Sequence, residues 1–213
     1  MKKQGMTADQ VTIDPARSAL LLMDFQAAIV SIYTKTDPAL VERAAGLLAA
    51  GRNAGLTVIH VQVAFRPNLP EVSARNKLLS SIKNSAQHRQ IFEGAAGAIH
   101  AALAPQGDDI VITKHRVNAF AGTDLDMILR ARDINTLILL GIASSGVVLS
   151  TLLDAADRDY RLIVAQDCCA DLDAEGHAWL TTKFFPRLAS MVETIDLLKA
   201  LRAGGSSQRA AQQ

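Results

Sequence analysis

Cysteine is scarce in this 213-residue chain, and its two cysteines, Cys168 and Cys169, are neighbours. Adjacent cysteines cannot cross-link distant segments, and a disulfide between them would have poor geometry, so a disulfide framework is excluded. The chain also has no Cys-x-x-Cys motif and no Cys/His cluster, which excludes a thiolate zinc site. We therefore expect both thiols to be reduced and structural.

Long apolar runs and an excess of one charge are missing as well. No apolar run approaches the ~20 residues that a membrane-spanning helix needs. The 22 basic and 21 acidic residues leave a net charge of +1, so nothing favours nucleic acid or an anionic membrane as a partner. The first residues include two lysines without an apolar segment behind them, which is not the pattern of a signal peptide. We expect a cytoplasmic protein.

The chain does have many short apolar runs, which separate amphipathic stretches, and 49% of its residues are hydrophobic. Each run is nearly all apolar, which is typical of strands buried on both faces. The runs lie at 18–23, 56–63, 109–113, 136–140, 161–165 and 191–194. Strands that alternate with helices predict an α/β fold, a three-layer α/β/α sandwich with a mostly parallel, Rossmann-like sheet of about six strands.

The domain organisation predicted from composition is simple. Residues 1–17 form an irregular N-terminal arm, residues 18–202 form one domain, and the polar, glycine-containing residues 203–213 form a disordered tail.

Within the domain, residues 66–97 have weak periodicity and predict a long loop with a short helix. This segment is rich in basic residues: Arg66, Arg75, Lys77, Lys83 and Arg89. A solvated basic surface is the favoured explanation. The alternative is a cationic lid over the site of a carboxylate-bearing substrate.

The most informative stretch is 135–160, NTLILLGIASSGVVLSTLLDAADRDY. Its apolar run ends at Gly141, small residues form a turn, and helical spacing of apolar residues begins at Val147. Such a strand–turn–helix unit directs backbone N–H groups and the positive end of a helix at one point, which suits an oxyanion or a carboxylate. A simple tight connection is the alternative explanation.

Two further polar residues follow strands of the same predicted sheet. Asp24 follows the first run and Lys114 follows the third. In parallel sheets, ligands bind beyond the carboxyl ends of the strands, so Asp24, Lys114 and the turn at 144–147 share the edge where a site is expected. A single Asp or Lys at a strand end is more often a cap or a salt-bridge partner, and the sequence does not show that the three meet.

Three segments resemble motifs of the isochorismatase-like hydrolase superfamily, which includes nicotinamidases and carbamoyl-amidases. They are LLLMDFQ at 20–26, VITKHRVNAF at 111–120 and GIASSGVVLSTLLDAADRDY at 141–160. The resemblance extends over residues 17–200. It implies that Asp24 and Lys114 are catalytic, and that Val147 stands where the thiol enzymes of the superfamily have their nucleophilic cysteine.

The resemblance also implies features around these residues. Ala143, Ser144, Ser145 and Gly146 would form the oxyanion turn, with a non-proline cis peptide at Ala143–Ser144. Weaker candidates for substrate binding are Phe25, Gln26, Arg66, Arg116 and Phe120. The histidines that hold a metal in nicotinamidases are replaced after the second strand by residues 64–67, AFRP. We therefore expect no metal and no cofactor. We also expect the protein to form a homodimer or a higher homo-oligomer.

Three functional hypotheses follow from the valine. An isopropyl group cannot attack a carbonyl carbon, so the favoured hypothesis is a cysteine-independent hydrolase that acts on a small, carboxylate-bearing molecule by acid catalysis from Asp24. The second is a family member that has lost catalysis and binds a small molecule. The third is an amide hydrolase with another nucleophile: Ser144, Ser145, Cys168 or Cys169.

Overall fold

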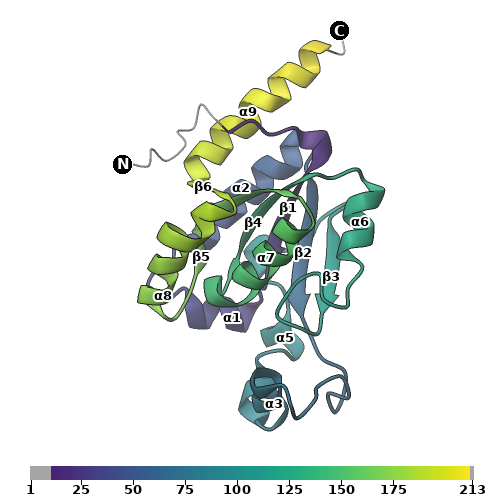
Figure 1. The fold of residues 1–213 in the computed structure, drawn as a ribbon, viewed down its shortest axis with the longest axis vertical. Helices are drawn as coiled ribbons and strands as arrows, with labels where there is room; N and C mark the ends of the chain where they lie inside the picture. The colour runs from purple at the N-terminus through teal and green to yellow at the C-terminus, as the bar shows by residue number, and fades with distance from the viewer. Residues whose placement is uncertain (1–10, 212–213) are drawn as a thin grey trace.

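The computed structural model describes the backbone of residues 11–211 and the side chains up to residue 203. A six-stranded sheet lies at its centre, in the order β3-β2-β1-β4-β5-β6, and all neighbouring strands are parallel (Figure 1). The strands are β1 (Ser18–Met23), β2 (Thr57–Val63), β3 (Ile110–Lys114), β4 (Thr136–Ile142), β5 (Arg161–Ala170) and β6 (Ser190–Val192). This topology confirms the predicted three-layer α/β/α sandwich.

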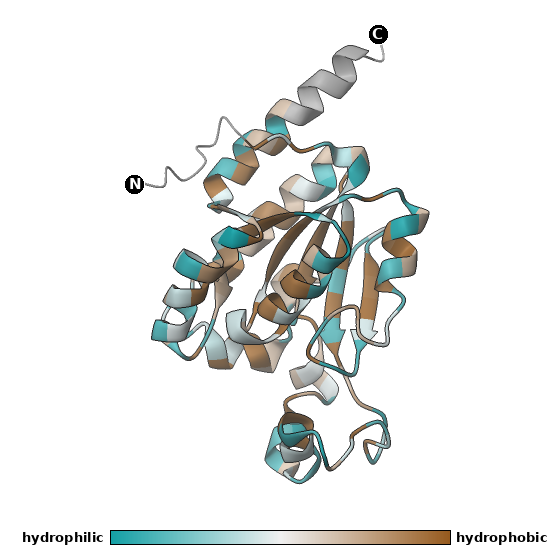
Figure 2. Cartoon of the chain, viewed as in Figure 1, coloured by the Kyte–Doolittle hydropathy of each residue, from teal (hydrophilic) through white to brown (hydrophobic). Residues whose placement is uncertain are grey.

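Helices cover both faces of the sheet because its central strands are apolar on both sides, as Figure 2 shows. Outside residues 66–97, the α-helices of the described chain are α1 (Ala27–Tyr33), α2 (Leu40–Ala54), α6 (Leu125–Ala131), α7 (Leu149–Asp157), α8 (Ala174–Trp179) and α9 (Thr194–Ala211). Successive strand residues point to opposite faces. Leu20 and Leu22 therefore pack in one cluster with α2 and α9, whereas Leu21 and Met23 pack in the other with α6 and α7.

Strand β5 is longer than the sequence predicts. Residues 166–171 were expected to form an exit loop after a strand at 161–165, but β5 continues to Ala170. The pairing with β4 shifts between Leu139 and Gly141, because Leu139 pairs with Val164 and Gly141 pairs with Cys169. This bulge absorbs the polar residues that interrupt the apolar pattern, and so the pattern alone predicts too short a strand.

Residues 66–97, called the lid segment below, leave the end of β2 and carry three short helices rather than one. These are α3 (Lys77–Lys83), α4 (Ala86–Gln90) and α5 (Gly94–Gly97). Figure 1 shows α3 and α5 beyond the end of the sheet near α1. The segment has a small apolar cluster of its own, formed by Leu69, Val72 and Leu79.

The structure describes little of the predicted N-terminal arm but most of the backbone of the predicted C-terminal tail. Most of the predicted N-terminal arm, residues 1–10, lies outside the described residues, and a short 3₁₀ helix, Pro15–Arg17, leads into β1. Helix α9 reaches Ala211, so its backbone extends through most of the segment that composition predicts to be disordered. Within residues 11–211, no helix combines the length and the apolar character that a membrane crossing requires.

Gly141 provides a test of how tightly the sheet is packed. A Cβ atom at this position would lie 2.8 Å from the Met23 carbonyl oxygen and 2.9 Å from the Met23 Cβ atom. We expect Gly141→Ala to lower the free energy of unfolding by about 1–3 kcal/mol, because the neighbouring backbone has to move. Urea unfolding followed by circular dichroism measures the change.

Gly46→Ala is the matched control. No atom lies within 4 Å of a Cβ built at this helical glycine, so alanine should raise the free energy of unfolding by about 0.5–1 kcal/mol. Equal effects of the two substitutions would contradict the close approach of β4 to β1.

Candidate functional site

Asp24 and Lys114 meet at the carboxyl edge of the sheet. Asp24 follows β1 and Lys114 ends β3, and β2 lies between these strands. The Lys114 Nζ atom lies 2.8 Å from Asp24 Oδ2 and also donates a hydrogen bond of 3.1 Å to the Arg116 carbonyl. Lys114 is 2% exposed and Asp24 is 6% exposed. The structure therefore brings the two predicted catalytic residues together in one buried contact.

The backbone fixes the direction of the Asp24 side chain. Its φ angle is 60°, in the left-handed region, which aspartate tolerates better than most residues. The Asp24 N–H group donates to the Val61 carbonyl at 2.8 Å, so the residue remains tied to β2. Its second carboxylate oxygen, Oδ1, is buried and has no hydrogen-bond partner among the described residues. One oxygen is thus held by lysine and the other is free to act.

The pKa of the Asp24 carboxyl group is raised above its ordinary value. Burial is the larger cause, because it penalises the charged form, and the neighbouring Lys114 acts in the opposite direction. A raised pKa keeps the carboxyl group protonated to a higher pH than a surface aspartate. This property suits a group that donates a proton.

Asp24 lines an apolar pocket of about 230 Å³, called the inner pocket below. Its walls come from α1, the lid segment and the turn after β4. They include Ile29, Ile32, Tyr33, Val63, Phe65, Leu78, Leu79, Ile82, Ile91, Phe92, Val117, Ile142, Ala143, Gly146 and Val147. Asp24, Lys114 and Arg116 supply the charged groups. An apolar pocket with a few convergent polar groups is typical of a small-molecule site.

The turn after β4 brings Val147 to this pocket. Residues Ser144–Val148 form a π-helical turn before α7. Val147 is 2% exposed and lines the inner pocket with Gly146 and Ala143. The non-proline cis peptide lies at Ile142–Ala143. The prediction of Ala143–Ser144 was wrong by one residue, since no sequence signal marks such a bond and its position was transferred from the resemblance.

Ser144 and Ser145 have other partners and do not line the inner pocket. The Ser144 Oγ atom is 2.8 Å from His177 Nδ1 and 3.3 Å from the Ala170 carbonyl oxygen. Ser145 donates from its backbone N–H and from its hydroxyl to Asp171 Oδ2, each at 2.7 Å. These contacts join the turn to the end of β5, so both serines hold the turn in place.

Three of the weaker candidates lie away from the pocket lining. Phe25 is buried in the core cluster with α2. The Gln26 side chain bonds the backbone of Val63 on β2 and the Gly97 carbonyl at the end of the lid segment. Phe120 stacks on Tyr160 with a ring-centroid distance of 6.2 Å. These three residues were predicted because they lie in the motif segments, but the contacts of their side chains are structural.

The two arginine candidates lie at the mouth of the site. Arg116 lines the inner pocket, and its guanidinium donates to the carbonyls of His115 and Glu71. The Arg66 side chain is 61% exposed and lies 3.8 Å from Glu71 Oε1. Arg116 therefore links the end of β3 to the lid segment, and Arg66 faces solvent.

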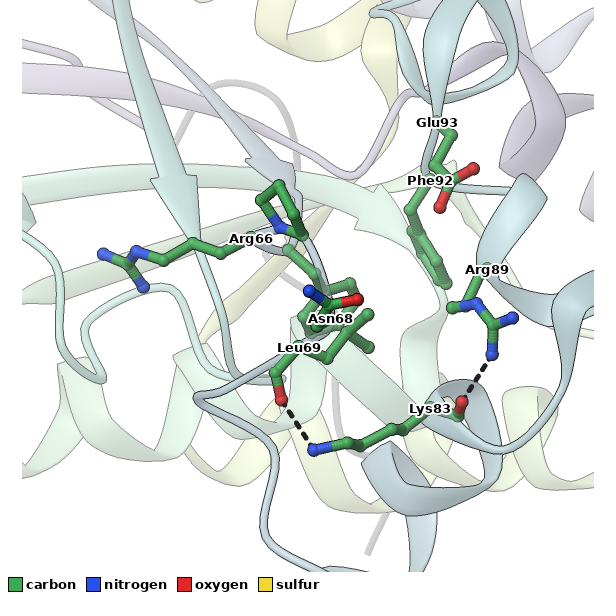
Figure 3. Close-up of a pocket in the computed structure, with 9 residues that line it drawn as sticks. Arg66, Asn68, Leu69, Lys83, Arg89, Phe92 and Glu93 are labelled. Atoms are coloured by element: carbon green, nitrogen blue, oxygen red, sulfur yellow. Dashed lines mark hydrogen bonds between the residues drawn. The ribbon is translucent and has the colours of Figure 1, made fainter.

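A second cavity of about 660 Å³, called the outer chamber below, is shown with its lining residues in Figure 3. Phe65 and Phe92 line both spaces, and their rings meet edge to face at 5.4 Å. The other residues of the outer chamber are Arg66, Pro67, Asn68, Leu69, Lys83, Arg89 and Glu93.

The sequence analysis missed most of the apolar wall. Leu78, Leu79 and Ile82 of α3 line the inner pocket, and their helical spacing within the lid segment was the available signal. Tyr33 had no such signal. Over residues 11–211, no group of three or more His, Cys, Asp or Glu side chains is placed to hold a metal ion.

Comparisons with known proteins agree with this geometry. The sequence model of the Isochorismatase domain matches residues 18–196. Maleamate amidohydrolase of Pseudomonas putida is 28% identical over 191 residues, which cover 87% of each chain. Ureidoacrylate amidohydrolase of Methylobacterium radiotolerans is 33% identical over 178 residues, covering 75% of this chain and 69% of that protein.

A solved structure extends the likeness to the fold. An isochorismatase family protein from Burkholderia thailandensis is 29% identical, with a TM-score of 0.78, over 90% of this chain and 98% of that one. The domain match spans the segments that contain Asp24, Lys114 and the turn at Val147. The chain belongs to the isochorismatase family of hydrolases.

Proposed function

We propose that this protein hydrolyses a small, carboxylate-bearing molecule by acid catalysis from Asp24, without a cysteine nucleophile. The observation that carries the proposal is the Asp24 carboxyl group itself. It faces an apolar pocket, its pKa is raised by burial, and its Oδ1 atom has no partner among the described side chains. Val147 occupies the nucleophile position of the thiol enzymes, and its isopropyl group adds to the apolar wall.

For a vinyl ether, the reaction begins with transfer of the Asp24 proton to the alkene carbon. Water then adds to the oxocarbenium ion, and the hemiketal breaks into a carbonyl compound and an alcohol. The proton that the water releases restores the Asp24 carboxyl group, so the atoms balance with water as the only co-reactant. Lys114, 2.8 Å from Oδ2, stabilises the aspartate anion that exists after the first step.

The names of the relatives widen the set of substrates to test. Maleamate and ureidoacrylate amidohydrolases are named for acids with an amide or ureido group. We propose isochorismate, maleamate, ureidoacrylate, nicotinamide and carbamoyl-amines as the assay panel. Vinyl-ether hydrolysis ranks first for this chain, because direct protonation by Asp24 needs no covalent intermediate.

Binding without turnover is the second candidate function. Val147 is 2% exposed and fills the position where a nucleophile would stand, while the inner pocket remains open. A protein of this kind would bind the small acid and show no activity on any member of the panel.

A different nucleophile is the third candidate, and the described geometry gives it little support. Ser144 is fully buried and bonded to His177. Cys168 and Cys169 are buried on β5 and do not line the inner pocket.

We further propose a cytoplasmic homodimer or higher homo-oligomer. Buried free thiols suit a reducing compartment. Exposed apolar side chains, such as Met127, Trp179 and Ile195, supply contact area for a second copy.

Replacement of the proton donor separates the first candidate from the second. Asp24→Asn should lower kcat by about 10²–10⁴-fold, because general acid catalysis typically contributes this much. Substrate affinity should change little, since the amide keeps the shape of the carboxyl group. Steady-state kinetics and calorimetric binding measure the two effects.

Asp108→Asn, at an exposed position, is the control and should leave kcat unchanged. Full activity of Asp24→Asn would refute acid catalysis by this residue.

Alkylation separates the first candidate from the third. Burial raises the pKa of Cys168 and of Cys169 to about 12, so both remain protonated thiols at pH 8. The folded protein should keep its activity after iodoacetamide treatment, and mass spectrometry should find both thiols unmodified. Both should react after unfolding in guanidinium chloride. Loss of activity on alkylation, prevented by Cys169→Ser, would identify a thiol mechanism.

A further inference from the structure

Two cations of the outer chamber have neutral partners. The Lys83 Nζ atom donates to the carbonyls of Leu69 and Val72, at 3.0 and 3.4 Å. The Arg89 guanidinium donates to the Lys83 carbonyl (Figure 3). Within the described part of the chain, neither side chain forms an ion pair with a carboxylate. The chamber thus holds two positioned charges that lack an ion-pair partner among the described residues, and the Glu93 carboxylate also lines it.

Arg116, like Arg89, donates to backbone carbonyls, whereas two other partly buried arginines form ion pairs. Arg52 forms an ion pair with Asp109, and Arg158 forms ion pairs with Asp154 and Asp126. A backbone carbonyl fixes the position of a cation but leaves its full charge available. Carbonyl-held cations in a concave surface are therefore ready to bind an anion through charge-assisted hydrogen bonds.

The outer chamber and the inner pocket share two lining residues, Phe65 just after β2 and Phe92 of the lid segment. A ligand that spans both cavities would have its reacting group at Asp24, its apolar portion along Leu79 and Ile82, and its far end in the outer chamber.

We propose, on the basis of the proposed function, that the substrate is an amphipathic carboxylic acid whose carboxylate binds in the outer chamber, which Lys83 and Arg89 line. Its apolar portion fills the inner pocket, and its labile bond lies at Asp24. Lys83 and Arg89 determine specificity for the anion. The Arg66 side chain extends away from them in Figure 3 and has no part in the proposal. Glu93 also lines the chamber and favours a ligand with one negative charge over a dianion.

The test uses 4-phenylbutyrate and its neutral amide, 4-phenylbutyramide, as probes. Isothermal titration calorimetry gives both affinities in the wild-type protein and in Asp24→Asn, which binds without turnover. The carboxylate should bind more tightly than the amide in both proteins. Lys83→Gln and Arg89→Gln should each raise the Kd of the carboxylate about tenfold, as expected for a charge-assisted hydrogen bond, and leave the Kd of the amide unchanged.

Lys77→Gln is the matched control, because Lys77 lies on the same helix, is exposed and does not line the chamber. Equal affinity of the two probes, or an equal effect of Lys77→Gln, would overturn the proposal. Equal weakening of both probes by Lys83→Gln and Arg89→Gln would overturn it too, since these residues would then only hold the lid segment. A protein that binds the carboxylate in this way but hydrolyses nothing would refute the proposed function and leave this anion site standing.

Discussion

The buried contact between Asp24 and Lys114 is the interaction on which the site depends. Burial favours the protonated carboxyl group, and the close geometry of the contact lets Lys114 stabilise the anion that forms when the proton is donated. Here the parallel order β3-β2-β1 fixes that geometry, because it sets Lys114 at the end of one strand and Asp24 just beyond another. Lys114 also bonds the Arg116 carbonyl. Within this pair, Asp24 Oδ1 is the buried oxygen without a hydrogen-bond partner among the described residues, which is why the proposed reaction assigns the proton to it.

The valine at position 147 changes what this pair can do. Beside a thiol, an aspartate that accepts a proton would generate the nucleophile. Beside an isopropyl group, no such proton exists, and the apolar wall instead favours the protonated carboxyl group. The same aspartate and lysine therefore suit the donation of a proton rather than its removal. The lid segment adds to this wall, since α3 contributes apolar side chains to the lining of the inner pocket.

The strands, and the sheet edge that Asp24 and Lys114 share, could be predicted from the sequence because both follow from strand ends. Apolar runs bounded by Asp24 and Lys114 mark where β1 and β3 stop, and parallel strands bring their ends to one edge.

Side-chain direction was not predictable in the same way. Phe25 and Gln26 follow Asp24 in the chain, yet one packs in the core and the other bonds the backbone of β2. The bulge in β5, the site of the cis peptide and the carbonyl partners of Lys83 depend on tertiary contacts that no local pattern encodes.

The central claim is that burial outweighs the charge of Lys114 at Asp24, and titration of the Asp24 carboxyl group tests it most directly. Carbon NMR of protein labelled at the aspartate carboxyl carbons, with Asp24→Asn for assignment, follows the protonation of this one group. The account predicts a midpoint above the ordinary value of 3.8, and a further rise in Lys114→Met, because the lysine charge lowers the pKa. A midpoint at or below 3.8 in the wild-type protein would contradict the account.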